Sequence, residues 1–155
     1  MPVVPIQDLK ALLAPGARLA GLDVGTKTIG IAVSDVSRRI ATARETVRRG
    51  KFQADAQRLK RLTETEGIGG FIVGLPVSMD GTEGPRCQSI RQFAANLVAV
   101  IDLPTAFWDE RLSTAAVERM LIDEVDMTRR RRAQVVDKLA AAYILQGALD
   151  AMDFR

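Results

Sequence analysis

Apolar residues fall along the chain in short runs of two kinds, and these runs predict the secondary structure. Runs that are bounded by Gly, Pro or charge are typical of buried strands. They cover residues 19–24, 29–33, 40–47, 70–75 and 105–108. Runs with the spacing of an amphipathic helix cover residues 6–13, 51–66, 85–100, 115–122 and a last stretch from 133 or earlier to 150.

The order of these elements predicts the fold class. Three strands come first, with a tight Gly-Thr-Lys reversal between the first two, and strands then alternate with helices. An antiparallel opening followed by βαβ crossovers indicates an α/β fold of the ribonuclease H-like kind, with a mixed five-stranded sheet and helices on both faces. We expect residues 1–155 to form a single domain, with residues 1–17 as a peripheral N-terminal segment.

Composition excludes several classes of protein. No apolar run is long enough to span a membrane, and no basic segment precedes an apolar one at the N-terminus. Cys87 is the single cysteine, which suits a reducing cytoplasm, so we expect a cytoplasmic protein without a membrane partner. The chain contains no histidine, which excludes His-dependent nucleophilic catalysis and His-containing zinc sites. Any polar chemistry must use carboxylates, hydroxyls and cations.

Asp23 is the first candidate site residue. It lies in the apolar strand 19–24, where an ionised carboxylate costs several kcal/mol unless it is compensated. A divalent cation is an efficient compensator. The alternative is that Asp23 caps a hairpin turn, where Asp is common.

A second candidate site follows the strand 105–108, where Asp109, Glu110 and Arg111 adjoin a helix cap. Ligands gather outside the carboxyl ends of strands in open α/β sheets. Because neighbouring strand residues point to opposite faces, we expect only one of the two acids, Asp109 or Glu110, to enter a shared site. The alternative is a solvated loop with a surface ion pair to Arg111.

Asp137 is the third candidate. Residues 137, 140, 141, 144 and 148 share one helical face, and all of them except Asp137 are apolar. The alternative is a first-turn acid that the helix dipole favours.

Three acids without histidine match Mg²⁺ or Mn²⁺, which take oxygen ligands and bind substrate phosphate. Such ions activate water for in-line attack on a phosphodiester.

These residues resemble the YqgF/RuvX family of Holliday-junction resolvases and ribosomal RNA processing nucleases. The resemblance runs from about residue 19 to 149 and rests on four motifs: residues 21–30 (GLDVGTKTIG), 73–76 (VGLP) with Gly81 and Gly84, 109–113 (DERLS) and 137–141 (DKLAA).

The resemblance implies a ribonuclease H-like fold, with Asp23, Glu110 and Asp137 as catalytic and metal-binding acids. It also implies a cytoplasmic, metal-dependent nuclease that matures the 5′ end of pre-16S rRNA, with precursor rRNA, ribosomal particles or branched DNA as partners. One departure is Thr28, where many members carry a basic residue after the position of Lys27. A missing phosphate contact there would weaken affinity rather than chemistry.

Basic residues are consistent with a nucleic-acid partner. We expect nucleic-acid contacts from Lys27, Arg111, Arg129, Arg130, Arg131 and Arg132. Further charge lies at Arg38, Arg39, Arg48, Arg49 and Lys51. We expect the run 129–132 to lie immediately before the helix that carries Asp137, and the alternative for it is a solvated helix terminus. Aromatic residues make up 5% of the chain, so recognition should depend on phosphate and shape rather than on base stacking.

Other functions remain open at this point. An Asp-x-Gly turn after a first strand also occurs in sugar-kinase and actin-like ATPases, but these need two lobes and 155 residues supply one. A non-catalytic nucleic-acid or ribosome-binding module would gain nothing from a cluster of carboxylates. The sequence leaves open RNA or a DNA junction as substrate, the number of metal ions and the oligomeric state. The loop 76–84 either approaches an anion at the start of the next helix or is a plain βα loop.

Overall fold

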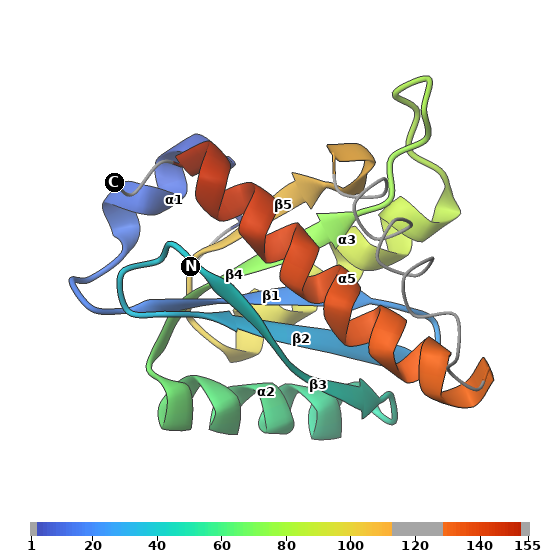
Figure 1. Cartoon of the computed structure of the whole chain (residues 1–155), viewed down its shortest axis with the longest axis horizontal. Helices are drawn as coiled ribbons and strands as arrows, with labels where there is room; N and C mark the ends of the chain where they lie inside the picture. The colour runs from blue at the N-terminus through green and yellow to red at the C-terminus, as the bar shows by residue number, and fades with distance from the viewer. Residues whose placement is uncertain (1–2, 113–128, 153–155) are drawn as a thin grey trace.

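Five strands form one mixed sheet: Arg18–Val24 (β1), Thr28–Ser34 (β2), Ala41–Arg48 (β3), Ile68–Leu75 (β4) and Thr105–Asp109 (β5). Their order in the sheet is β3-β2-β1-β4-β5 (Figure 1). The pairs β1–β2 and β2–β3 are antiparallel, whereas β1–β4 and β4–β5 are parallel. The computed structural model describes the backbone of residues 3–112 and 129–152, and the side chains of the same residues except 129–137.

The register of the parallel strands determines where a site can form. Leu22 of β1 is aligned with Val73 of β4, and Leu75 of β4 is aligned with Asp109 of β5. The carboxyl ends of β1, β4 and β5 therefore meet at one edge of the sheet, the place where ligands gather in α/β proteins.

Helices cover both faces of this sheet. They span Ile6–Leu12 (α1), Phe52–Glu66 (α2), Pro85–Val100 (α3) and Arg129–Met152 (α5), and Glu110–Leu112 forms a 3₁₀ turn (η1). α5 crosses one face, and α1 packs beside it (Figure 1). Buried residues of α2 and α3 pack against the other face.

Two hydrophobic cores result, one on each face. In β1, Ala20, Leu22 and Val24 belong to the core under α2 and α3. Leu19 belongs to the core under α5, and Gly21 lies directly beneath that helix. Asp23 has the same parity along the strand as Leu19 and Gly21, so it is on the α5 face.

The structure confirms the expected strands and most of the helices. α2 ends as expected at Gly67, whose φ of +67° is the left-handed conformation that favours glycine at a helix end. The expected helix 115–122 lies outside the described residues. Within the described ranges, no helix combines the length and apolarity needed to cross a bilayer.

Two expectations need correction. The N-terminal segment is not merely peripheral, because Leu9 of α1 is fully buried in the core under α5 and Val3 bridges to Thr105 of β5. The four arginines at 129–132 do not precede the last helix, because α5 begins at Arg129 and the run forms its first turn.

Candidate active site at the carboxyl ends of β1 and β5

Asp23 occupies the last residue but one of β1, opposite Gly30 of β2. Its side chain is half-buried, unlike its neighbours Leu22 and Val24, which are buried. The strand places this carboxylate on the α5 face, near the edge where the parallel strands end. Asp23 is therefore part of the sheet itself, within two residues of the β1–β2 turn.

Glu110 lies next to Asp23, although 86 residues separate them in sequence. It is the first residue of η1, directly after β5. Burial and, after it, the charge and hydrogen bonding of Asp23 raise the pKa of Glu110 to about 7, although the charge of Arg86 opposes the shift. The two carboxyl groups are thus close enough to share a proton. Like charges held this close favour either a bound proton or a bound cation.

Gly74 makes room for Glu110. A Cβ atom at this position of β4 would overlap Ile144 Cδ1 and lie 3.1 Å from both Cγ and Oε1 of Glu110. A larger residue there would require the side chains of Ile144 and Glu110 to shift, so glycine lets the Glu110 carboxyl lie against the strand between β1 and β5. The sequence placed Gly74 in a motif but gave no sign of this contact, which depends on the sheet order.

Asp109, the other acid considered for this site, binds Arg111. The Arg111 backbone N–H donates to Asp109 Oδ1 at 2.9 Å, and Arg111 Nε donates to both carboxylate oxygens at 2.9–3.0 Å. The Arg111 guanidinium holds the pKa of Asp109 below its ordinary value. The surface ion pair considered for this segment therefore exists, but it involves Asp109 and leaves Glu110 to the site.

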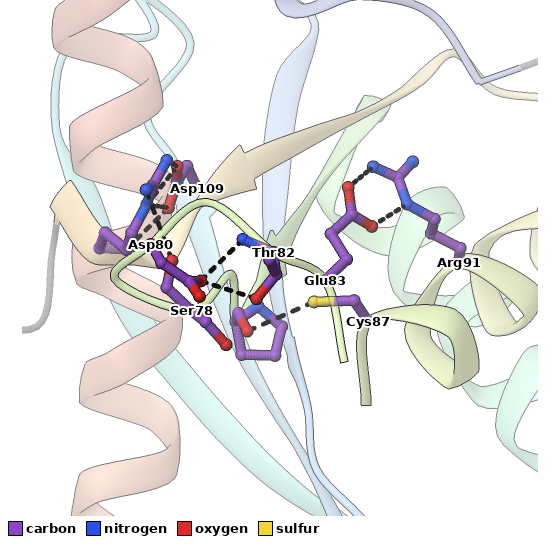
Figure 2. Close-up of polar contacts among 9 residues, drawn as sticks. Ser78, Asp80, Thr82, Glu83, Cys87, Arg91 and Asp109 are labelled. Atoms are coloured by element: carbon purple, nitrogen blue, oxygen red, sulfur yellow. Dashed lines mark hydrogen bonds and ion pairs between the residues drawn. The ribbon is translucent and has the colours of Figure 1, made fainter. Parts of the chain in front are cut away.

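Arg111 also joins this turn to the loop 76–84. Its Nη1 donates to the Ser78 carbonyl at 3.4 Å. Within the loop, Asp80 Oδ1 accepts hydrogen bonds from the Thr82 backbone and hydroxyl (Figure 2). The Thr82 hydroxyl bond lowers the pKa of Asp80. Arg111 thus has structural partners here, and its expected contact with nucleic acid remains a prediction.

The loop 76–84 also forms hydrogen bonds with α3. Glu83 accepts two hydrogen bonds from Arg91, at 2.6 and 2.8 Å, and the Cys87 thiol donates to the Pro76 carbonyl (Figure 2). The Arg91 guanidinium in turn lowers the pKa of Glu83. The loop is therefore an ordered connection between β4 and α3.

Asp137 belongs to α5, one helical turn before Ala141, whose carbonyl lies close to Gly21 of β1. Its side chain is outside the described residues, as are those of Arg129, Arg130, Arg131 and Arg132. Among the side chains that the structure does describe, no group of three Asp, Glu, His or Cys residues converges. Asp23 and Glu110 form the described pair, and Asp137 as third ligand remains a prediction.

The other basic candidates differ in their surroundings. Lys27 is exposed in the β1–β2 turn. Arg38 instead supports the fold, since its Nη1 donates to the carbonyls of Ala14 and Ala17. Arg49, noted only as added charge, and Arg86, not singled out from sequence, border a pocket beside Asp23. Their basic type was visible in the sequence, but their convergence depends on the fold.

Residues 17–151 of this chain match the model of the RuvX family, which is described as Holliday junction resolvase. The chain belongs to the RuvX family. Relatives support this: a protein of Paramagnetospirillum magneticum is 59% identical over 150 residues, covering 97% of this chain and 96% of the relative. One of Rhodospirillum rubrum is 57% identical over 153 residues, covering 99% and 95%. Both carry the name "Putative pre-16S rRNA nuclease".

Solved structures show that this RuvX-family chain shares its fold with two known resolvases. Thermus thermophilus RuvC, solved with a Holliday junction, superposes with a TM-score of 0.56 at 15% identity, covering 89% of this chain and 97% of RuvC. The yeast mitochondrial resolvase Ydc2 gives 0.50 at 10% identity, covering 94% and 86%. These likenesses confirm the expected fold.

Proposed function

We propose that this chain is a divalent-metal-dependent endonuclease that hydrolyses phosphodiester bonds in nucleic acid, in the 5′ maturation of pre-16S rRNA. The observation that carries the proposal is the contact between Asp23 and Glu110 at the carboxyl ends of β1 and β5. Membership of the RuvX family and the nuclease names of relatives more than 50% identical support the same reaction. A cytoplasmic location and an association with ribosomal particles follow from this role and belong to the proposal.

The donor set fits Mg²⁺ or Mn²⁺. Two carboxylates in contact, with the pKa of one raised to about 7, are favourable to a cation that replaces the shared proton. Hard divalent cations bind through a few carboxylates and substrate phosphate, and histidine is not needed. Asp23 and Glu110 would hold the ion, with Asp137 of α5 as the proposed third ligand.

The chain's own residues then have distinct roles in the reaction. A bound cation would supply an activated water and offset charge on the leaving oxygen. Asp23, fixed by strand pairing, gives a rigid ligand, and Gly74 fixes the position of Glu110. Basic residues near the site, including Lys27, Arg111 and the arginines at 129–132, would hold backbone phosphate.

Holliday-junction cleavage is the second candidate function. It is favoured by the description of the matching family and by the likeness in fold to RuvC. The reaction at the acids would be the same, so only the substrate distinguishes the two candidates. A non-catalytic nucleic-acid module is the third candidate, and a failure to cleave either substrate would favour it.

The deciding experiment compares cleavage of labelled precursor rRNA and of a labelled four-way DNA junction, each with Mg²⁺ and with Mn²⁺. We expect cleavage of the precursor rRNA, its loss in Asp23→Asn and in Glu110→Gln, and most of the rate retained in Asp109→Asn. Asp109→Asn is the matched control, because it removes the neighbouring acid that pairs with Arg111. Unchanged cleavage in Asp23→Asn would contradict the proposed site.

A further inference from the structure

A pocket of about 170 Å³ opens beside the two acids, between the β1–β2 turn, the end of β3 and the first turn of α3. Val24, Gly25 and Thr26 line it, and they directly follow Asp23 in the chain. Because extended chain advances by at most about 3.6 Å per residue, the backbone of Thr26 is within roughly 11 Å of that of Asp23. The pocket and the proposed active site are therefore neighbours.

Its polar lining consists of hydrogen-bond donors and hydroxyls. The residues lining the pocket are Val24, Gly25, Thr26, Arg49, Pro85, Arg86, Ser89 and Ile90. Arg49 and Arg86 are cationic, Thr26 and Ser89 carry hydroxyls, and no member of this lining is acidic or aromatic. Such a lining suits an anion and offers a nucleobase no aromatic ring to stack on.

Both guanidinium groups are held in place by the fold. Arg49 Nη1 donates to the Gly25 carbonyl at 2.7 Å, and its guanidinium lies 5.3 Å from the centre of the Phe93 ring. Arg86 Nη2 donates to the Val24 carbonyl at 3.2 Å. These main-chain contacts use only part of each guanidinium, which carries five N–H donors in a planar fork that matches phosphate.

The position of Arg86 links the pocket to the acids. The Arg86 guanidinium lies near enough to Glu110 for its charge to act on that carboxyl group. An anion in the pocket would thus lie on the cationic side of the same edge of the sheet, while Asp23 and Glu110 form the acidic side. A nucleic-acid strand that presents one phosphate to the acids has another phosphate next to it along the backbone.

We propose that this pocket binds a backbone phosphate of the nucleic-acid strand adjacent to the phosphodiester at the acids, with Arg49 and Arg86 as its two donors. The inference rests on the proposed function, because it takes the acids as the place of cleavage. The pocket sets the register of the strand, and it recognises phosphate without regard to base identity.

The test measures binding of a labelled single-stranded RNA as a function of KCl concentration, without divalent ions. Each lost phosphate contact lowers the magnitude of the log–log salt slope by roughly 0.7 for a single strand. We expect this loss in Arg49→Gln and in Arg86→Gln, and no larger loss in the double variant, because both arginines bind one phosphate. Arg61→Gln, which changes an exposed arginine on α2, is the control and should leave the slope unchanged.

Ser89→Asp is a second test, and it does not require the Arg49→Gln variant to fold correctly. It places a carboxylate at an exposed position of the pocket lining and should weaken RNA binding at low salt. A set of RNAs that each carry one neutral methylphosphonate completes the test. A methylphosphonate at one position of the RNA should weaken its binding to the wild type and leave its binding to Arg86→Gln unchanged. Equal sensitivity of both proteins at every position would overturn the proposal.

The same experiments separate this inference from the proposed nuclease activity. If the wild type fails to cleave with Mg²⁺ or Mn²⁺ but the arginine variants lose salt slope, the nuclease function is wrong and the phosphate pocket stands. If the wild type cleaves and all pocket variants keep its salt slope and its KM, the pocket proposal is wrong and the nuclease function stands.

Discussion

Adjacent acids at the end of β5 have opposite environments because they differ by one backbone position. Asp109 is the last strand residue and binds Arg111, which lowers its pKa. Glu110 begins the 3₁₀ turn and meets Asp23, and burial beside another carboxyl raises its pKa. Strand alternation predicts that only one of these two acids enters the site. The choice of Glu110 came from family resemblance, and the contact with Asp23 agrees with it.

The raised pKa of Glu110 predicts an unusual pH dependence of stability. Its pKa rises from 4.5 to about 7 on folding, so the folded state holds the proton more tightly. Stability from this group is therefore complete below about pH 4.5 and is lost as pH rises through 7. At 1.36 kcal/mol per pKa unit, and discounted for partial exposure, the loss is roughly 1–2 kcal/mol.

Urea unfolding between pH 5 and 8, in the presence of a chelator, measures this loss. The metal-free wild type should lose roughly 1–2 kcal/mol more of its unfolding free energy than Glu110→Gln, which has no proton to lose there. Asp35, Asp80 and Asp109 have pKa values below 3.8, so their contributions are lost only at more acid pH. An identical pH profile in both proteins would show that Glu110 titrates normally.

Gly74 gives the second prediction for a single residue. Gly74→Ala should cost about 1–3 kcal/mol of stability through overpacking against Ile144. It should also displace Glu110 and reduce cleavage by roughly 10- to 100-fold, since small misplacements of catalytic groups are costly. Gly70→Ala is the matched control, because its Cβ would press on Leu19 and the Pro104 carbonyl at the other end of β4. Equal cleavage rates for both folded variants would contradict the positioning role of Gly74.

At the scale of elements, the sequence predicted the features that depend on local sequence patterns. Strands and long helices were correctly located because run length, turn residues and helical spacing are local signals. The burial of Leu9 was missed, because a helix of seven residues has too few apolar positions to show which face it buries. The arginine run 129–132 was placed before α5 instead of in its first turn, because such a run is equally typical of a loop and of a first turn.

The arginine run at the start of α5 gives the prediction for an element. Four cations in a helix's first turn oppose the helix dipole, so a bound anion there would be favourable. Replacing two of Arg129, Arg130, Arg131 and Arg132 with Gln should flatten the salt dependence of RNA or junction binding. The slope should fall by roughly 0.7–0.9 per lost contact.

Cleavage by that variant at saturating substrate should change much less than binding, because these residues would hold backbone rather than the reacting bond. Lys60 and Arg61 of α2 provide the control, since both are exposed on a helix that packs against the opposite face of the sheet. If both double Gln variants show the wild-type slope, the run only solubilises the helix end.

At the scale of the whole molecule, the site joins segments that are far apart in the chain. Asp23 comes from β1, Glu110 follows β5, and Gly74 lies in β4 between them. The role of Gly74 and the pocket of Arg49 and Arg86 could not be predicted from sequence, because neither has a local pattern. They arise only when the sheet order brings β4 between β1 and β5, and when β3 ends near the start of α3.

Because these segments are far apart in the chain and meet in one sheet, metal binding should stabilise the whole fold. A ligand at 100 times its Kd adds about 2.7 kcal/mol, which is roughly 5–10 °C in the unfolding temperature of a chain of this size. Mg²⁺ or Mn²⁺ should therefore raise the Tm of the wild type, and more strongly at pH 8 than at pH 5, since Glu110 must lose its proton to bind.

Asp23→Asn should reverse the order of stability. Without metal at pH 8, the variant should unfold at a higher temperature than the wild type, because the repulsion between the carboxylates of Asp23 and Glu110 is removed. With saturating Mn²⁺ the wild type should be the more stable protein, because the variant has lost a ligand. Thermal unfolding of both proteins across a metal titration measures this crossing. A metal-induced shift of equal size in both would mean that the cation binds elsewhere, and Asp23 would then be only a half-buried acid in a strand.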